Sequence, residues 1–187
     1  MGHYLDIQLL EDPEIAVHQL LAALYSKLHR ALAALGCTTI GVSFPDYAEH
    51  PAQLGQRLRL IGPVTSLGQL TAQDWLGGMR DHVVIGHVGA VPQHAVARPL
   101  RRVQAKSNPD RLRRRQMARH GLSAAQAVQQ VPDTAAERLH LPFLQLGSAS
   151  TGQRFRLYLR LGPPAAQAID GTFNAYGLST AATVPHF

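Results

Sequence analysis

Alternating and helical patterns of hydrophobic residues define the first half of the chain. Residues 4–9 alternate between apolar and polar side chains, which predicts a half-buried strand. A helix is predicted from Asp12-Pro13-Glu14 to Gly36, because leucines recur between them at helical spacing, at Leu20, Leu21, Leu24, Leu28, Leu32 and Leu35. The remaining patterns predict strands over 39–44, 56–61 and 82–88 and a helix over 66–79. The resulting order, β-α-β-β-α-β, is the ferredoxin-like split motif, also used by RNA-recognition-type domains.

The second half of the chain predicts a smaller α+β unit. Pro92 and Pro99 with the polar stretch between them mark a boundary near 93–98, so two domains are expected, 1–95 and 96–187. A capping box at Ser123–Gln126 opens a helix that stops before Pro132. The other expected elements are strands over 102–106, 143–146, 155–161 and 173–178 and a helix over 109–120. The fold class is therefore α+β, with a ferredoxin-like (RRM-like) βαββαβ domain followed by a smaller domain that carries an arginine-rich helix.

Positive charge is concentrated in one segment. The chain of 187 residues has a formal net charge of +6, and 9 of its 18 Lys and Arg residues lie between positions 98 and 119, opposed only by Asp110. The rest of the chain carries 9 basic against 11 acidic residues, or −2. The basic balance points to a polyanionic partner, and that partner is expected at this segment.

The basic segment reads as a helix over 109–120. Asn108 can cap it, Pro109 suits its first position and Gly121 ends it. Arg111, Arg115 and Arg119 recur every fourth residue, with Arg114 beside them, and form a cationic stripe roughly 12 Å long. A solvated helix face is the ordinary explanation of such a run. The use of Arg rather than Lys, without alternating acids, favours phosphate recognition instead.

Composition excludes several classes of chemistry. Cys37 is the single cysteine, so no intramolecular disulfide and no Cys-based zinc site can form. The N-terminus lacks the basic start and apolar run of a signal peptide, and no apolar stretch is long enough to span a bilayer, so a cytoplasmic protein is expected. Nucleotide-binding loops, the HExxH motif and paired acids are all absent, so neither a metal nor a cofactor is expected. A nuclease built from this chain would need side-chain acid–base catalysis.

The residues alone do not choose a catalytic group. Ten histidines are candidates. Taken by itself, His29 reads as a histidine on a helix surface, Ser148 and Ser150 as hairpin turn residues, and Tyr176 as a core aromatic.

A set of segments distributed over the whole chain resembles the CRISPR-associated repeat endoribonuclease of subtype I-F (the Cas Six / Csy Four family). The resemblance is most specific at 102–109 followed by the arginine run at 111–115. The other matching segments are 3–7, 27–29, 40–46, 119–120, 132–134, 141–143, 150–153, 155–157 and 176–179.

The resemblance implies a role for each matching residue. His29 would be the acid–base residue acting on the RNA 2′-hydroxyl, Ser148 would position that hydroxyl, and Tyr176 would orient the imidazole. Arg102 and Gln104 would read base edges, and Phe155 would stack on the terminal base pair. The remaining RNA-binding residues would be Ser107, Asn108, Arg111, Arg114, Arg115, Arg119, His120, Ser150 and Thr151.

The resemblance also implies a reaction and partners. A metal-independent enzyme would cut CRISPR precursor RNA at the base of the repeat hairpin, leaving a 2′,3′-cyclic phosphate and a 5′-hydroxyl. It would be a monomer when free, stay on the crRNA hairpin and join the other subunits of the surveillance complex. Two alternatives remain: a non-cleaving hairpin-binding subunit of a CRISPR-linked effector or transposition complex, which the arginine helix supports equally well, and a duplex-DNA binder.

Overall fold

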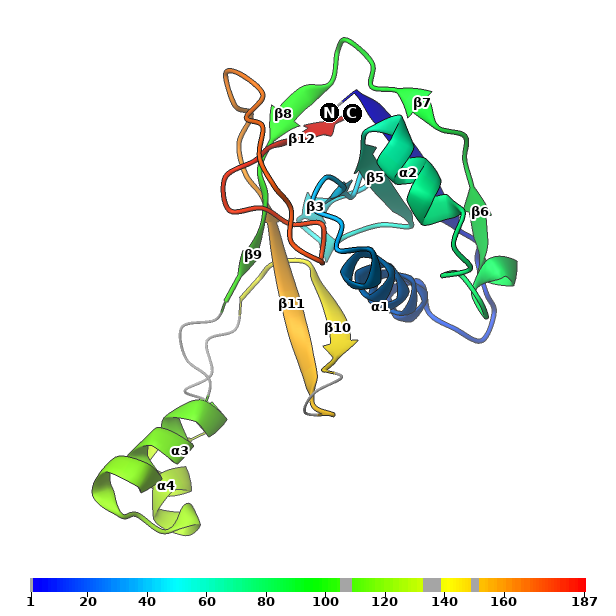
Figure 1. Ribbon diagram of the computed structural model, residues 1–187. Coiled ribbons are helices and arrows are strands. Elements are labelled where there is room, and N and C mark those ends of the chain that lie inside the picture. The colour runs from blue at the N-terminus through cyan, green and yellow to red at the C-terminus, as the bar shows by residue number, and fades with distance from the viewer. Residues whose placement is uncertain (1, 105–108, 133–138, 149–151) are drawn as a thin grey trace. The chain divides into compact units, whose positions relative to one another are not determined.

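The computed structural model describes residues 2–104, 109–132, 139–148 and 152–187 (Figure 1). The chain forms two compact units, which are described separately below. The first contains residues 1–102 and 141–187, and the second contains residues 103–140. These units are defined by packing, whereas the predicted domains 1–95 and 96–187 follow a change in sequence pattern. Their division stays a prediction.

An antiparallel sheet forms the centre of the first unit. Its strands follow the order β2-β5-β1-β6, and β7 also pairs with β1. Apolar residues of β1 lie opposite apolar residues of β5, with Leu5 facing Leu60 and Ile7 facing Leu58. The strands are β1 (His3–Leu9), β2 (Gly41–Ser43), β5 (Arg57–Gly62), β6 (Val83–Ile85) and β7 (Gly89–Ala90). The predicted alternation of 4–9 is confirmed, because every second residue of β1 from Leu5 onward is buried.

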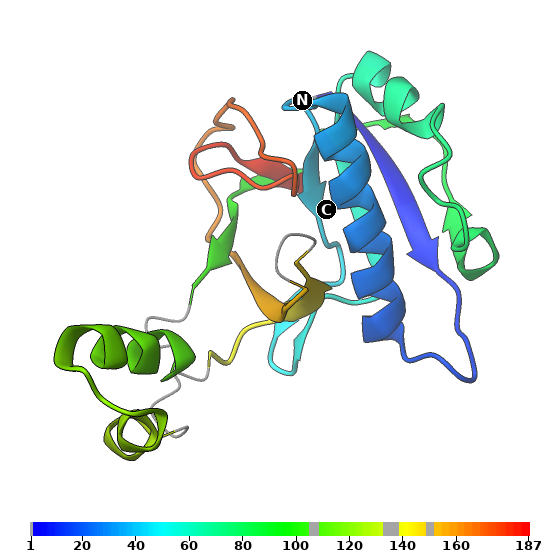
Figure 2. The ribbon, with the colours of Figure 1, turned by 60° about the horizontal axis from the view of Figure 1, so that its bottom comes forward.

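Two helices contribute to the core of this unit. Helix α1 (Val17–Leu35) buries the apolar face predicted from its leucine spacing and lies beside β1 in Figure 2. Its predicted start at Asp12 is wrong, because the Asp12 carboxylate accepts hydrogen bonds from the amides of Glu14 and Ile15 and closes a turn before the helix. At the other end, Gly36 takes the left-handed conformation that terminates a helix.

Helix α2 (Val64–Thr71) is shorter than the pattern over 66–79 predicted. The residues beyond it form turns, and a short 3-10 helix η1 (Arg80–His82) follows. Leu76 and Met79 are nevertheless buried. Their apolar side chains thus contribute to the core although these residues are not helical. Gly78 has a φ of 72°, which a continuous right-handed helix would not allow.

Smaller sheets complete the first unit. One has the order β10-β11-β9, and two further pairs are β12 with β8 and β3 with β4. Their bounds are β3 (Ala48–Glu49), β4 (Ala52–Gln53), β8 (Val96–Arg98), β9 (Leu100–Val103), β10 (Phe143–Gly147), β11 (Arg154–Leu161) and β12 (Val184–His186). The strand predicted at 173–178 is wrong, because those residues form a loop. Gly177 has a φ of 68°, and the side-chain oxygen of Asn174 accepts hydrogen bonds from the amides of Tyr176 and Leu178 and so closes a turn.

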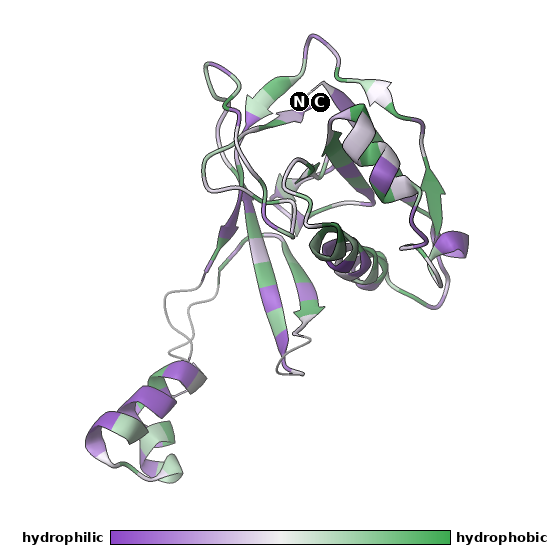
Figure 3. Ribbon diagram, in the orientation of Figure 1, coloured by the Kyte–Doolittle hydropathy of each residue, from purple (hydrophilic) through white to green (hydrophobic). Residues whose placement is uncertain are grey.

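The second unit holds the arginine-rich helix. Helix α3 (Pro109–His120) has the predicted bounds and is strongly hydrophilic in Figure 3. Helix α4 (Ala124–Gln130) starts with the predicted capping box between Ser123 and Gln126. Ala127 and Val131 are buried apolar residues of this unit.

The architecture is α+β, as predicted, and its sheets are antiparallel. Over the part of the chain that the structure describes, none of the helices combines the length and apolar character needed to cross a membrane.

Candidate active site

A cavity of about 560 Å³ in the first unit brings the three predicted catalytic residues together. Helix α1 contributes His29, the β10–β11 hairpin contributes Ser148 and Phe155, and the loop before β12 contributes Tyr176. Among the described residues, the lining includes Ser26, His29, Arg30, Leu146, Gly147, Ser148, Phe155 and Tyr176. The fold thus gathers side chains that are far apart in the sequence around a space that a nucleotide could enter.

The hydrogen bond of His29 determines which of its two ring nitrogens can take up a proton. Helix α1 buries the preceding Leu28 in the core, and His29 itself is half-buried. Its Nδ1 lies 2.9 Å from the backbone carbonyl oxygen of Ala175. A carbonyl oxygen can only accept, so Nδ1 carries the proton and donates. In the neutral ring, the lone pair able to take a proton is then on Nε2.

Tyr176 covers one face of the same imidazole. The two rings are nearly parallel, with 3° between their planes and 3.8 Å between their centroids. The backbone carbonyl of Tyr176 accepts a hydrogen bond of 2.7 Å from the hydroxyl of Tyr25, which is fully buried on α1. Burial raises the pKa of the Tyr25 hydroxyl far above its usual range, so this hydroxyl remains a donor.

Ser148 lies at the end of the β10–β11 hairpin and is half-buried. Its amide donates to the carbonyl of Gln153 at 2.9 Å, and its carbonyl accepts from the amide of Gly152 at 2.8 Å. The backbone of Ser148 is therefore held by two hydrogen bonds where the residue lines the cavity. A serine hydroxyl in this place can donate to or accept from a ribose hydroxyl.

Phe155 and Arg102 lie together beside this cavity. The guanidinium carbon of Arg102 is 5.8 Å from the centroid of the Phe155 ring, within the range of a cation–π contact. Arg102 is exposed on β9 and Phe155 is half-buried on β11. An aromatic face next to a guanidinium is a surface on which a base can stack while its edge or phosphate is hydrogen-bonded.

In the second unit, the predicted cationic stripe of α3 is on the surface. Arg111, Arg114, Arg115, Arg119 and His120 are all exposed, as is Gln104. Arg113, which was not predicted as a contact, is instead half-buried and donates from Nε to the carbonyl of Val131 at 2.8 Å.

Four predicted RNA-binding residues, Ser107, Asn108, Ser150 and Thr151, lie outside the described residues. Among the residues that are described, no group of three or more His, Cys, Asp or Glu side chains is arranged to hold a metal ion.

The sequence reasoning missed the partners that hold His29. Ala175 acts through its backbone carbonyl, which no side-chain pattern can reveal. Tyr25 could only be read as one more apolar residue on the buried face of α1. Arg30 follows His29 directly and lines the same cavity, yet it lies outside the basic segment at 98–119.

Known proteins resemble this chain over nearly its whole length. The family described as "CRISPR-associated protein (Cas_Csy4)" matches residues 4–187. A "CRISPR-associated endonuclease Cas6/Csy4" from Pseudomonas aeruginosa (strain UCBPP-PA14) is 51% identical over 187 residues, covering 100% of both chains. A protein of the same name from Escherichia coli (strain UTI89 / UPEC) is 43% identical over 187 residues, again with 100% of both chains covered.

Full-length relatives at 51% and 43% identity identify the chain as a CRISPR-associated endonuclease. Within that class, the chain belongs to the Cas_Csy4 family.

Proposed function

We propose that the chain cleaves CRISPR precursor RNA at the base of its repeat hairpin, without a metal ion, and remains bound to the hairpin product. Its assignment as an endoribonuclease rests on its family and its relatives. The observation that carries the mechanism is the orientation of His29, whose Nδ1 donates to Ala175 and whose Nε2 is left to take a proton in the cavity shared with Ser148.

The chemistry follows from the RNA itself, which carries the nucleophile. Nε2 of His29 removes the proton of the 2′-hydroxyl, and the hydroxyl of Ser148 holds that group in place. The 2′-oxygen bonds to the adjacent phosphorus while the bond from phosphorus to the 5′-oxygen breaks. The leaving oxygen takes up one proton, from the His29 imidazolium or from a second acid, and becomes a 5′-hydroxyl, while the upstream strand keeps a 2′,3′-cyclic phosphate. Water does not enter this step.

Substrate binding in this proposal uses both units. Phe155 stacks on the terminal base pair, and Arg102 and Gln104 hydrogen-bond base edges near the foot of the stem. The exposed arginines of α3 contact phosphates along the groove of the hairpin. Ser107, Asn108, His120, Ser150 and Thr151 are proposed as further contacts. The protein, a monomer when free, would then carry its crRNA into a complex with the other subtype I-F subunits.

We also assign the main sheet and its helices to the ferredoxin-like fold. The support is the strand order β2-β5-β1-β6, with α1 between β1 and β2 in sequence and α2 between β5 and β6. RNA-recognition-type domains use this arrangement, but it hosts many activities, so the proposed function rests on the cavity.

A second candidate function is a hairpin-binding subunit that does not cut. The exposed arginines of α3 favour it as much as they favour the nuclease, because phosphate contacts supply affinity in both cases. The two functions differ only at the cavity of His29.

One gel experiment separates these functions. Repeat RNA is incubated with the wild type, His29→Ala and His18→Ala, with EDTA present throughout. His18 is an exposed histidine of the same helix that does not line the cavity, so it is the matched control. The nuclease proposal expects cleavage by the wild type and by His18→Ala, and binding without cleavage by His29→Ala.

A substrate with a 2′-deoxy sugar at the cut site tests the nucleophile. It should bind normally and stay intact. Cleavage that survives the 2′-deoxy substitution or His29→Ala would sink the proposed mechanism. Binding without cleavage by the wild type, with or without divalent metal, would favour the non-cleaving subunit. Equal competition by DNA of the same sequence would favour a duplex-DNA binder.

A further inference from the structure

The loop over residues 174–178 makes both of the contacts that hold the His29 ring. Its carbonyl at Ala175 accepts from Nδ1 at 2.9 Å, and its Tyr176 ring covers the imidazole at a centroid separation of 3.8 Å. Nothing in α1 itself fixes the imidazole in one tautomer. The state of His29 therefore depends on what fixes the loop.

We propose that Asn174 and Tyr25 are positioning residues that lock this loop, so that the Ala175 carbonyl keeps His29 in its Nδ1–H tautomer with Nε2 available. Neither residue lines the cavity, and both act through the loop. The catalytic consequence rests on the proposed function, whereas the tautomer of His29 does not depend on it.

Asn174 ties the loop to itself. Its side-chain oxygen accepts hydrogen bonds from the amides of Tyr176 at 2.8 Å and Leu178 at 3.2 Å. Its own amide donates to the carbonyl of Leu178, and its carbonyl accepts from the amide of Gly177. These four bonds leave the carbonyl of Ala175, in the middle of the turn, free to face outward to His29.

Tyr25 ties the loop to the core. Its hydroxyl donates to the carbonyl of Tyr176 at 2.7 Å from a fully buried position on α1, one turn before His29. Its ring packs between those of Phe44 and Tyr176, at centroid separations of 6.0 and 6.4 Å. The same helix thus supplies the histidine and the anchor of the loop that holds it.

A third contact fixes the loop against strand β2. The amide of Val42 on β2 donates to the carbonyl of Gly177 at 3.0 Å. A Cβ at Gly177 would lie 2.6 Å from a side-chain carbon of Val42, and its φ of 68° suits only a residue that tolerates the left-handed region. The hydrogen bond and the close approach of Gly177 to Val42 therefore restrict how the loop can pack against the sheet.

The decisive measurement reads the tautomer directly. Two-bond proton–nitrogen NMR spectra of the 15N-labelled imidazole distinguish the protonated ring nitrogen from the unprotonated one at alkaline pH, where imidazoles are neutral. We expect the full-length wild type without RNA to show Nδ1 protonated and Nε2 unprotonated at His29. A wild-type ring protonated on Nε2 would overturn the proposal without any variant.

Two variants of Asn174 are then compared with a matched control. Asn174→Ala removes both accepted hydrogen bonds, whereas Asn174→Asp keeps an oxygen acceptor in the same place and should restore the wild-type tautomer. The control is Ser179→Ala, since Ser179 accepts two backbone amides, those of Ala181 and Ala182, in the next turn and has no bond to the loop of Ala175. We expect mixed tautomers in Asn174→Ala and the wild-type tautomer in Ser179→Ala.

Kinetics supply the second readout. Under single-turnover conditions with saturating RNA, Asn174→Ala and Tyr25→Phe should each slow cleavage by about 10-fold while the Kd for RNA changes less than about twofold. Asn174→Asp should recover most of the rate. Equal losses in Asn174→Ala and Ser179→Ala, or an unchanged His29 tautomer in Asn174→Ala and Tyr25→Phe, would contradict positioning. If the wild type binds RNA without cutting, the proposed function fails. The NMR measurement still tests whether Asn174 and Tyr25 control the tautomer of His29, because it is made without RNA.

Discussion

The imidazole of His29 lies parallel to the phenol ring of Tyr176, with ring planes 3° apart and centroids 3.8 Å apart. The contact joins α1 to a loop near the other end of the chain. The hydrogen bond of His29 to the preceding residue of that loop, Ala175, spans 146 positions. One side of the ring is therefore fixed by stacking and one nitrogen by a carbonyl, which leaves a single nitrogen for chemistry.

The stacking predicts different effects for two substitutions of Tyr176. Tyr176→Phe keeps the aromatic face and should retain most of the cleavage rate, whereas Tyr176→Ala removes the stacking and should lower the rate about 10-fold. The backbone bonds of residue 176 are unchanged in both. Single-turnover cleavage rates check this. Equal rates for the Phe and Ala variants would show that stacking does not position the imidazole.

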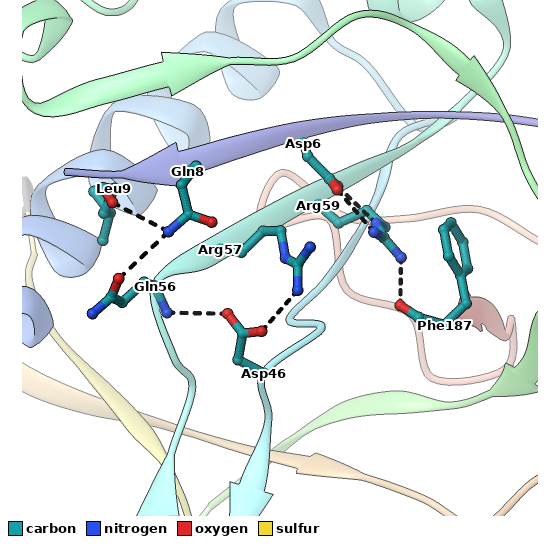
Figure 4. Close-up of polar contacts among 8 residues, drawn as sticks. All are labelled: Asp6, Gln8, Leu9, Asp46, Gln56, Arg57, Arg59 and Phe187. Carbon is teal, nitrogen blue, oxygen red and sulfur yellow. Dashed lines mark hydrogen bonds and ion pairs between the residues drawn. The ribbon is translucent and has the colours of Figure 1, made fainter.

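Stability should depend strongly on a buried ion pair on β5. Arg59 is 4% exposed and makes two bonds to the Asp6 carboxylate, at 2.7 and 2.8 Å, and a third to the carbonyl of Phe187 at 2.7 Å (Figure 4). Its guanidinium also lies over the rings of Tyr4 and Phe187. Arg59→Leu should lower the free energy of unfolding by about 3 kcal/mol, because Asp6 loses its partner in a partly buried place.

Arg57 provides the matched control for that measurement. It lies two residues earlier on the same strand, and its single ion pair with Asp46 is more than one-third exposed on both sides. Arg57→Leu should therefore cost less than about 1 kcal/mol. Urea unfolding of both variants gives the comparison. If Arg57→Leu lowers the free energy of unfolding as much as Arg59→Leu does, burial of the ion pair does not determine its contribution to stability.

The salt dependence of RNA binding should locate the phosphate contacts. If about five phosphates are neutralised, the logarithm of the binding constant should fall with the logarithm of salt concentration at a slope of roughly −3.5 to −4.5. Replacing Arg115 and Arg119 together with Gln should flatten the slope by about 1.4 to 1.8, since each lost phosphate contact removes about 0.7 to 0.9.

Arg80→Gln is the control for charge as such. Arg80 is exposed in η1, in an ion pair with Asp74, and is outside the proposed RNA contacts. Its replacement should leave the slope unchanged within error. A wild-type slope near −1, or an equal flattening by Arg80→Gln, would argue against a footprint centred on α3.

Stability should also fall at mildly acidic pH because of His186. Burial and, after it, the nearby Arg98 and Arg59 lower the pKa of His186 below its ordinary value of 6.5. The unfolded chain therefore binds a proton that the folded chain rejects. The contribution of His186 is complete above pH 6.5 and declines as the pH falls from there towards the lowered pKa of the folded state.

The variant His186→Gln cannot titrate and should show a smaller loss of stability between about pH 7.5 and pH 5.5. Thermal unfolding midpoints measured at both pH values check this. The lowered pKa of Asp12 arises mainly from the amides of Glu14 and Ile15. Its effect on stability is lost only below about pH 3.8, outside the pH range of this comparison. Identical pH profiles for the wild type and the variant would contradict the assignment.

The sequence determined the features of this protein that depend on neighbouring residues. The alternation of β1, the apolar face of α1, the bounds of α3 and the capping box of α4 were all readable, because period, cap and turn chemistry act over a few positions. Most of the arginines of α3 also stay exposed as expected, and the exception is the half-buried Arg113. The roles of individual residues came from resemblance to a family, since composition left ten histidines equivalent.

The tertiary structure decided that 173–178 is a loop and which atoms hold His29. Each of these depends on a partner remote in sequence or on a backbone atom: a carbonyl of Ala175, a buried hydroxyl of Tyr25, the seat of Gly177 against Val42. Every residue has the same backbone carbonyl, so no side-chain pattern distinguishes the one that meets an imidazole. Only the folding of distant segments onto one another makes that carbonyl, and with it one nitrogen of His29, different from the rest.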